Sequence, residues 1–309
     1  MKVEKNYKID VIIPTYKPDE KVVMLLQRLL KQTYPINEIH IVDTETGIFP
    51  EKIYSLSEKI KVTKVTKAEF DHGGTRAKAA DMSSAEILVF MTQDAMPLND
   101  HVLEKLVFSF KDEKVAAAYA RQVADSSCGV IEQYTRQFNY PSEGIVKSYE
   151  DVARLGIKAY FCSNVCAAYR KNVYDEIGGF VKRTIFNEDS IMAANMLKAG
   201  YSVAYAADAK VLHCHNYNCI QQFKRNFDLA VSQADHPEIF RDVKSESEGI
   251  RLVKDTAKYL CKKGKPWLVC SLFLNSGCKY MGYLAVKNYQ KLPEWMILKF
   301  TSNKEYWKR

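Results

Sequence analysis

Residues 87–97 read ILVFMTQDAMP, and this stretch indicates how the chain folds. Five apolar residues run without a break toward a single acid, Asp94, and then Pro97. An unbroken apolar run of this length is typical of a strand that is buried on both faces of a parallel sheet. The stretch therefore predicts a buried strand and raises the question of what a lone carboxylate does at its end.

The same pattern of a short apolar run and a turn recurs through the N-terminal third of the chain. One intervening segment, residues 21–32 (KVVMLLQRLLKQ), carries its apolar residues at helical spacing. Alternating strands and helices predict a parallel sheet with helices on its faces. Ligands bind such sheets beyond the carboxyl ends of the strands. We predict strands at residues 9–13, 38–42, 60–65 and 86–91.

Two of the predicted strands are followed by an acid. Asp43 follows His40-Ile41-Val42, and Asp94 follows the strand at residues 86–91. A single aspartate in such a place is usually a turn or helix cap. Two at the same edge of one sheet favour a functional site.

The segment FDHGGTR, residues 70–76, precedes a stretch that we predict to be helical, AKAADMSSAE. Glycines before a helix suit an anion, because free backbone N–H groups and the helix dipole point there. Arg76 would lie in the first turn, within reach of a diphosphate. The alternative is a plain helix-start loop with a solvent-facing arginine, since the glycine spacing matches neither the Rossmann nor the Walker A motif.

Glu188 and Asp189 open another predicted helix, which Gly200 ends. The alternative to a functional role is helix capping, which contributes less than about 1 kcal/mol. Farther on, VLHCH contains His213 and His215, which would face the same side of a strand. They are either an ordinary pair or ligands for a divalent metal.

Composition places the chain among soluble globular proteins. It has 309 residues, of which 47% are hydrophobic and 27% charged. The first residues, MKVEKNYKIDVIIP, lack a signal-peptide pattern, so we expect a cytoplasmic location. The eight cysteines form no CxxC motif, and in the cytoplasm we expect their thiols to be reduced. Residues 251–309 hold 13 Lys and Arg against 3 Asp and Glu, a net charge of +10. The whole chain carries +8, so residues 1–250 sum to −2. The basic character is therefore confined to the tail.

Taken in order, these segments resemble the inverting family 2 glycosyltransferases of the GT-A fold, and especially bacterial rhamnosyltransferases that build surface polysaccharides. The resemblance covers roughly residues 7–230. It implies an α/β, Rossmann-like, mostly parallel sheet with helices on both faces. The catalytic domain would be residues 1–230, with nucleotide binding in 1–100 and acceptor binding in 101–230, followed by a basic, aromatic-rich helical region at 231–309. The matching segments are VIIPTYKP, the strand ending in Asp43, FDHGGTRAKAA, VFMTQDAMP, SNVCAAYRK, NEDSIMAANMLKAGY and VLHCHNY.

In this family a divalent metal, Mg²⁺ or Mn²⁺, neutralises the leaving diphosphate, held by an Asp-x-Asp motif. Here that motif reads TQDA, with one acid where two or three are usual. The resemblance implies that Asp94 is the metal ligand, and Mg²⁺ often needs only one or two carboxylates. A histidine would complete the site, with His215 slightly preferred over His213.

The resemblance also implies the remaining roles. Asp189 would be the general base, with Glu188 orienting it or binding the acceptor, because an inverting transfer needs a carboxylate to take the acceptor proton. Asn164 would line the acceptor or donor-sugar pocket. The donor-binding residues would be Pro14, Thr15 and Tyr16 as the nucleotide wall, Asp43 at the base or ribose, Gly73, Gly74 and Arg76 at the diphosphate, and Gln93 beside the metal motif.

Residues 267–286 (WLVCSLFLNSGCKYMGYLAV) have the length of a membrane span, about twenty residues. A central lysine, Lys279, is costly in hydrocarbon. Lysines on both flanks and interleaved aromatics suit helices lying on an anionic membrane surface instead. The alternatives are a helical hairpin packed on the catalytic domain, a homo-oligomer contact, or nucleic-acid binding, which the apolar centre disfavours.

The function expected from this resemblance is transfer of a sugar with inversion, L-rhamnose from dTDP-L-rhamnose, onto a glycan or lipid-linked acceptor at the inner face of the cell membrane. Because the metal motif has a single acid, one alternative stays open: a catalytically inactive GT-A-fold nucleotide-binding or scaffold protein at the membrane. A nucleotidyltransferase is disfavoured, because PTYKPDE lacks the glycine- and basic-rich loop that such enzymes carry after the first strand.

Overall fold

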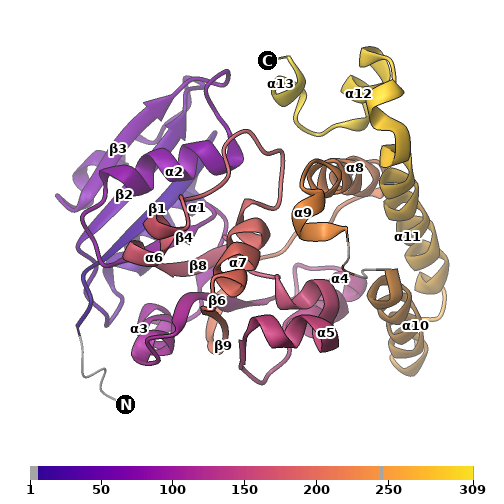
Figure 1. The fold of residues 1–309 in the computed structure, drawn as a ribbon, viewed down its shortest axis with the longest axis horizontal. Coiled ribbons are helices and arrows are strands. Elements are labelled where there is room, and N and C mark those ends of the chain that lie inside the picture. The colour runs from indigo at the N-terminus through magenta and orange to yellow at the C-terminus, as the bar shows by residue number, and fades with distance from the viewer. Residues whose placement is uncertain (1–5, 242, 244–245, 309) are drawn as a thin grey trace. The chain divides into compact units, whose positions relative to one another are not determined.

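The structure is a computed structural model that describes residues 6–241, 243 and 246–308. It divides into two compact units (Figure 1). We call the first the sheet unit, residues 6–123, 140–182 and 188–213, and the second the helical unit, residues 124–139, 183–187 and the described part of 214–309. The helical unit thus takes three segments from within the predicted catalytic domain, residues 124–139, 183–187 and 214–230. The functional boundary at residue 230 stays a prediction.

The first half of the sheet is parallel, as predicted. Its strands follow the order β3, β2, β1, β4. The first strand runs on through Pro14 to Tyr16, three residues beyond its predicted end at residue 13. Pairing with β4 stops at Ile12, so the missing N–H of Pro14 costs no ladder hydrogen bond on that side. The bounds are β1 Ile9–Tyr16, β2 Glu38–Thr44, β3 Ile60–Val65 and β4 Ile87–Met91.

Beyond β4 the sheet becomes mixed. Strand β8 pairs antiparallel with both β4 and β6, and β6 pairs parallel with β9. Two short strands, β5 and β7, pair antiparallel with β9. Its antiparallel pairs join segments far apart in the chain, so the alternation of strands and helices did not predict this half. The bounds are β5 Met96–Pro97, β6 Val115–Val123, β7 Ile145–Lys147, β8 Cys166–Arg170 and β9 Ser202–Leu212.

Helix α7 begins at Glu188 as predicted, and α1, predicted at residues 21–32, runs from Glu20 to Leu30. Asp19 caps α1 by accepting a hydrogen bond from the Lys21 N–H, and five Val and Leu side chains of α1 are buried. Gly200 follows α7 with a φ of +89°, the left-handed conformation that ends many helices. The helices of the sheet unit are α1 Glu20–Leu30, α2 His72–Met82, α3 Val102–Val107, α5 Val152–Leu155, α6 Lys171–Glu176 and α7 Glu188–Lys198, with short 3₁₀ turns between.

The helical unit is the C-terminal helical region predicted from the sequence, joined by one earlier helix. Phe227, Val231 and Ile297 lie in its core. Asp228 is fully buried there and accepts hydrogen bonds from the Thr301 hydroxyl and the Ser302 N–H, which fixes the end of the chain on α8. The helices are α4 Val130–Asn139, α8 Cys219–Asp235, α9 Pro237–Phe240, α10 Glu246–Lys262, α11 Leu268–Leu284, α12 Glu294–Phe300 and α13 Lys304–Trp307. Among the described residues, no helix is both long and apolar enough to cross a bilayer.

One pair of cysteines departs from the expectation of free thiols. Cys128 and Cys214, both in the helical unit, form a disulfide with Cα atoms 6.1 Å apart. The expectation is wrong for this pair because the two residues are 86 positions apart, and such a separation gives no spacing signal. The other six cysteines are free.

Candidate functional site

The carboxyl ends of β1 and β2 bring two predicted donor residues together. Thr15 and Asp43 are register partners on adjacent strands, and the Thr15 hydroxyl donates a hydrogen bond of 2.8 Å to Asp43 Oδ1. Both side chains are buried. Burial raises the pKa of Asp43, because the ionised form loses hydration, and the bond from Thr15 opposes the shift. The pair forms a polar floor at the edge where ligands of such sheets bind.

Tyr16 stands at the same edge, and Gln93 holds its backbone. The Tyr16 N–H donates to Gln93 Oε1 at 2.9 Å, and Gln93 Nε2 donates to the Tyr16 carbonyl at 3.1 Å. The tyrosine side chain itself is 48% exposed, with the ammonium groups of Lys17 and Lys67 within 6 Å of its ring centroid, at 5.6 and 5.9 Å. An exposed aromatic ring on a fixed backbone, beside two cations, suits stacking on a nucleotide base.

Helix α2 begins at His72, so both glycines of FDHGGTR lie in its first turn and not before it. Asp71 is the N-cap, and its Oδ1 accepts the Gly74 N–H at 2.6 Å. A Cβ on Gly73 would lie 1.9 Å from the Val181 carbonyl oxygen, so only glycine fits there. In this structure the glycine pair serves capping and close packing. Its contact with a diphosphate stays a prediction.

Arg76 lies against Glu188 instead of facing solvent. Its Nη1 is 3.2 Å from Glu188 Oε1, and both side chains are only 7% exposed. Burial opposes ionisation of Glu188, but the charges of Arg76 and His72 and the hydrogen bonds to its carboxylate together outweigh burial and lower the pKa of Glu188. The predicted contact of Arg76 with a diphosphate also remains a prediction.

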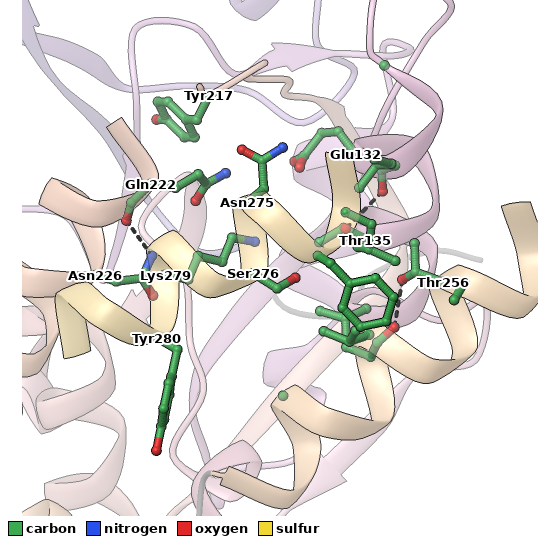
Figure 2. A pocket seen from close by; sticks show the side chains of 18 of the residues that line it. Glu132, Thr135, Tyr217, Gln222, Asn226, Thr256, Asn275, Ser276, Lys279 and Tyr280 are labelled. Atoms are coloured by element: carbon green, nitrogen blue, oxygen red, sulfur yellow. Dashed lines mark hydrogen bonds between the residues drawn. The ribbon is translucent and has the colours of Figure 1, made fainter. Parts of the chain in front are cut away.

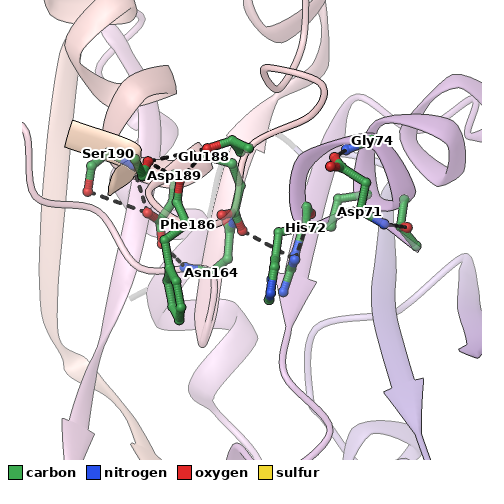
Figure 3. A network of polar contacts seen from close by, with 12 residues as sticks. Asp71, His72, Gly74, Asn164, Phe186, Glu188, Asp189 and Ser190 are labelled. Carbon is green, nitrogen blue, oxygen red and sulfur yellow. Dashed lines mark hydrogen bonds and ion pairs between the residues drawn. The ribbon is translucent and has the colours of Figure 1, made fainter. Parts of the chain in front are cut away.

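Asn164 joins the two acids at the start of α7. Its side-chain amide donates to Glu188 Oε1 at 3.2 Å, and its backbone N–H donates to Asp189 Oδ2 at 3.0 Å (Figure 3). Tyr169 fixes the orientation of Asn164 by donating to its Oδ1 at 2.9 Å. All four residues belong to the sheet unit. Asn164 therefore holds Glu188 and Asp189 in one fixed arrangement.

Asp189 has the protonation behaviour of a base that works near neutral pH. Burial, and then the neighbouring Glu188 carboxylate, raise its pKa to about 7. Two backbone N–H groups, those of Asn164 and Ser190, donate to its two oxygens and oppose the shift. The side chain remains partly exposed, so a substrate hydroxyl can reach it. General bases are most effective when their pKa lies near the operating pH.

The lone acid after β4 pairs with a histidine. Asp94 Oδ2 lies 3.5 Å from His213 Nε2, and the Asp94 side chain is 38% exposed. On the other side of the ring, His213 Nδ1 lies 2.9 Å from Gln122 Oε1. An Nδ1–H donated to Gln122 leaves the Nε2 lone pair directed toward Asp94, as in many metal-binding histidines. The carboxylate, the imidazole and the orienting Gln122 fit Mg²⁺ or Mn²⁺.

Within the sheet unit, the structure brings His213 to Asp94. His213 follows the end of β9 at Leu212, so the argument that both rings face one side of a strand does not apply. His215 comes two residues later and belongs to the helical unit. Its role as a ligand stays a prediction.

Two supporting residues were not predicted from the sequence. Gln122 was not singled out, although it ends β6 as Asp43 ends β2, and the same strand-end rule applies to it. Tyr169 gives no sequence signal, because its role depends on the hydroxyl meeting Asn164 inside the sheet unit.

Comparison with known proteins gives consistent matches. The family model described as Glycosyl transferase family 2 matches residues 10–178. The O-antigen chain rhamnosyltransferase RfbN of Salmonella typhimurium is 37% identical over 302 residues, 97% of this chain and 96% of that protein. The O-antigen chain rhamnosyltransferase WbaN of Salmonella anatum is 39% identical over 279 residues, 90% of this chain and 88% of that protein.

The fold has a solved counterpart. The mannosyltransferase PcManGT of Pyrobaculum calidifontis, determined in complex with GDP-Man and Mn²⁺, superposes with a TM-score of 0.59 at 14% identity, covering 99% of this chain and 87% of that one. At this identity the likeness establishes the GT-A arrangement of sheet and helices alone.

Proposed function

The chain belongs to glycosyltransferase family 2, and from this premise we propose that it transfers L-rhamnose from dTDP-L-rhamnose, with inversion, onto a glycan or lipid-linked acceptor in cell-surface polysaccharide synthesis. The observation that carries the proposal is the partly exposed Asp189 with its raised pKa, held by Asn164 beside Glu188. The choice of sugar is supported by the two rhamnosyltransferase relatives, which match this chain over nearly its whole length. That match also favours an enzyme over a scaffold protein.

In the proposed mechanism Asp189 takes the proton from the acceptor hydroxyl. Inverting transfer is a single displacement at the anomeric carbon, so the hydroxyl must lose its proton as the new bond forms. Two N–H groups fix both carboxylate oxygens of Asp189, which leaves their remaining lone pairs for the hydroxyl. Glu188 keeps its charge because Arg76 pairs with it, and that charge raises the basicity of Asp189.

The donor would bind at the carboxyl ends of β1, β2 and β4. Tyr16 supplies the stacking surface, and the Thr15–Asp43 pair supplies an acceptor for base or ribose hydrogen bonds. Asp94 and His213, with His215 as a third candidate, would hold the divalent cation. When bound, such a cation neutralises charge that develops on the leaving diphosphate.

The donor assignment predicts a specific pattern of nucleotide binding. The protein is expected to be stabilised by dTDP with Mg²⁺ or Mn²⁺ more than by UDP, GDP or CDP. A ligand at about 100 times its Kd adds about 2.7 kcal/mol to the free energy of unfolding. Thermal shift measures this effect, and release of dTDP from dTDP-rhamnose measures turnover. A metal-dependent shift with UDP alone would rule out rhamnose as the favoured sugar, and no shift with any nucleotide would overturn the proposed enzyme.

We also propose that the helical unit attaches to the membrane surface through one face of α11. Five large apolar residues on or next to this helix are 56–67% exposed, at spacings of one, six and seven residues that keep them on one side. Lys262, Lys263, Lys287 and Lys291 flank the helix and are exposed. Each lysine near an anionic bilayer contributes about 1 kcal/mol. The five residues are Trp267, Phe273, Leu274, Tyr280 and Met281.

Attachment through this face predicts binding to anionic vesicles that depends on its apolar side chains. The full chain should sediment with phosphatidylserine-containing vesicles and much less with phosphatidylcholine alone. The double variant Phe273→Asp/Leu274→Asp should lose this binding and keep its dTDP-induced thermal shift. A matched variant on the sheet unit, Ile48→Asp, replaces an equally exposed apolar residue and should bind as wild type. Unchanged sedimentation of the double variant would contradict the proposal.

A further inference from the structure

A second cluster of metal-ligand side chains lies at the amino ends of β1 and β2. Asp10 and Glu38 are register partners on these two parallel strands, and His40 follows Glu38 by two positions. Register partners, and residues two apart on one strand, share a face of the sheet, so the three side chains lie together. Thr15 lies five residues farther along β1, which is about 17 Å away at about 3.3 Å per residue. The cluster is therefore separate from the donor-binding edge of the sheet.

The possible ligand atoms of the three side chains meet in a small space. One oxygen each of Asp10 and Glu38 and one ring nitrogen of His40 lie within 4.8 Å of one another. His40 Nε2 is 3.5 Å from Asp10 Oδ2 and 3.2 Å from Glu38 Oε2. Two ligand atoms that are each about 2.1 Å from a tetrahedral Zn²⁺ ion are about 3.4 Å apart. Both measured distances therefore fit ligands that share one such ion.

His40 presents a buried nitrogen to this space without a hydrogen bond. The residue is 6% exposed, and its Nε2 makes no hydrogen bond with any described residue. A hydrogen bond between a charged N–H and a carboxylate normally closes to about 2.7–2.9 Å, which is shorter than either distance to Nε2. A buried polar atom without a hydrogen bond is destabilising. Coordination of a cation by the Nε2 lone pair would remove that cost.

Asp10 is held as a carboxylate, the form that binds a cation. It is fully buried, its Oδ1 accepts hydrogen bonds from Asn37 Nδ2 at 2.7 Å and the Glu38 N–H at 3.0 Å, and its Oδ2 accepts one from Ser83 Oγ at 2.5 Å. Burial raises the pKa of this carboxyl, but His40, Ser83 and Asn37 together outweigh burial and lower the pKa to about 2. Hydrogen bonds of this kind orient carboxylates that ligate metals.

Glu38 gives the cluster access to solvent. Its side chain is 38% exposed, against 1% for Asp10 and 8% for His40. An ion can enter from this side, and water can fill the fourth tetrahedral position, as in zinc sites with three protein ligands. The cluster differs in kind from the cavity that α4, α8, α10 and α11 line in the helical unit (Figure 2). It lies wholly within the sheet unit and has room for a single ion.

We propose that Asp10, Glu38 and His40 bind one Zn²⁺ ion that joins the amino ends of β1 and β2. One imidazole nitrogen and two carboxylate oxygens at tetrahedral separations suit Zn²⁺, whereas Mg²⁺ demands octahedral coordination. The ion also offsets the repulsion between the two carboxylates. Because it binds the folded arrangement of two strands, its role is to stabilise the fold. This role does not depend on the proposed sugar transfer.

Zn²⁺ binding can be measured by calorimetry on the full-length Asp94→Asn protein, in which the candidate active-site cation has lost a ligand. Zn²⁺ should bind saturably and raise the temperature of unfolding. Co²⁺ in its place should give the visible absorption of tetrahedral coordination without a thiolate-to-cobalt charge-transfer band, which separates this cluster from the free cysteines. A thiolate band, or no saturable Zn²⁺ binding, would overturn the proposal. In the second case His40 is only an ion-pair partner of the two acids.

His40→Gln, made in the same Asp94→Asn protein, tests the location. It removes the nitrogen ligand and should weaken Zn²⁺ binding about 100-fold or more, since loss of an orienting partner alone costs about 10–100-fold. The matched control is His101→Gln, because His101 also contacts an acid, Glu104, at 3.0 Å, and its side chain is exposed. The control should bind Zn²⁺ as its parent does. Equal affinities of the two variants would contradict the location.

Glu38→Gln keeps the proposal testable if His40→Gln does not fold, because the Glu38 side chain is partly exposed. It should weaken Zn²⁺ binding by about 10-fold or more, and Ser83→Ala, which removes a donor to Asp10, should weaken it by about 10–100-fold. Unchanged affinity in both variants would overturn the ligand set. With Asp94 intact, His40→Gln should keep the dTDP-induced thermal shift with Mn²⁺, and its loss would contradict two separate metal sites.

Discussion

Replacing Asp189 with asparagine is expected to lower kcat by about 10²–10⁴-fold, the contribution of a positioned general base. Asparagine has nearly the same size, but it cannot take a proton from the acceptor hydroxyl. Both carboxylate oxygens of Asp189 accept a hydrogen bond from a backbone N–H. In the asparagine variant, the NH₂ group would replace one of these oxygens and face a donor. The measurement is single-turnover transfer of rhamnose, together with the dTDP-induced thermal shift, which should survive. Full activity in this variant would disprove the base assignment.

The pH dependence gives a second readout of the same assignment. A base with a pKa raised to about 7 is protonated below that pH, so kcat/KM for the wild type should rise as pH increases through about 7 and then level off. The sign for stability is opposite. The folded state binds this proton more tightly than the unfolded state, so the contribution of Asp189 is present below its ordinary value of 3.8 and is lost as pH rises toward about 7.

Glu188→Gln separates the base from its neighbour. The Glu188 carboxylate raises the pKa of Asp189, so its neutralisation should move the rising limb of the profile to lower pH. The freed charge of Arg76 acts in the same direction. The control Asp175→Asn, at an exposed position of α6, should leave the rising limb of the pH profile in place. A limb that stays near pH 7 in Glu188→Gln would show that another group sets it.

The parts of the fold that sequence alone could predict are those with local periodicity. The apolar runs at residues 9–13, 38–42 and 60–65 each became strands in a parallel half-sheet. The antiparallel strand β8 was not predicted, because residues 166–170 pair with residues 87–91 across a large sequence separation, and nothing in either segment specifies that partner. The start of α2 was placed too late, because the capping side chain of Asp71 precedes two glycines that weaken the helical pattern.

The candidate site divides in the same way. Acids at strand ends and helix starts carry a local signal, which is why Asp43, Asp94 and Asp189 could be singled out. The groups that orient them depend on contacts between distant residues. Gln122 meets a histidine 91 positions away, and Asn164 meets an acid 25 positions away. Side-chain amides such as those of Gln122 and Asn164 occur in many sequence contexts. Their orienting role can therefore be recognised only from the folded structure, where they meet His213 and Asp189.

Asp94→Asn is expected to abolish the metal-dependent part of nucleotide binding, the second large effect. Asparagine keeps the shape of the side chain and removes the charge that attracts a divalent cation. Loss of a partner that only orients a ligand typically costs about 10–100-fold in metal affinity, and loss of a charged ligand should cost more. The readout is the difference between the dTDP-induced thermal shift with Mn²⁺ and with EDTA, which should vanish in this variant and persist in the exposed Asp81→Asn.

A graded series tests whether Asp94 acts together with His213. Gln122→Leu keeps the side-chain volume but removes the acceptor for His213 Nδ1, so the ring loses its fixed orientation. It should weaken Mn²⁺ binding by about 10–100-fold, less than Asp94→Asn. His213→Ala and His215→Ala then compare the two histidines directly. Gln122 fixes the His213 ring from one side and Asp94 lies 3.5 Å from its Nε2 on the other, so the loss of His213 should have the larger effect. A metal-dependent shift that survives in Asp94→Asn and in His213→Ala would place the cation on other ligands, and the lone acid after β4 would then be a turn residue.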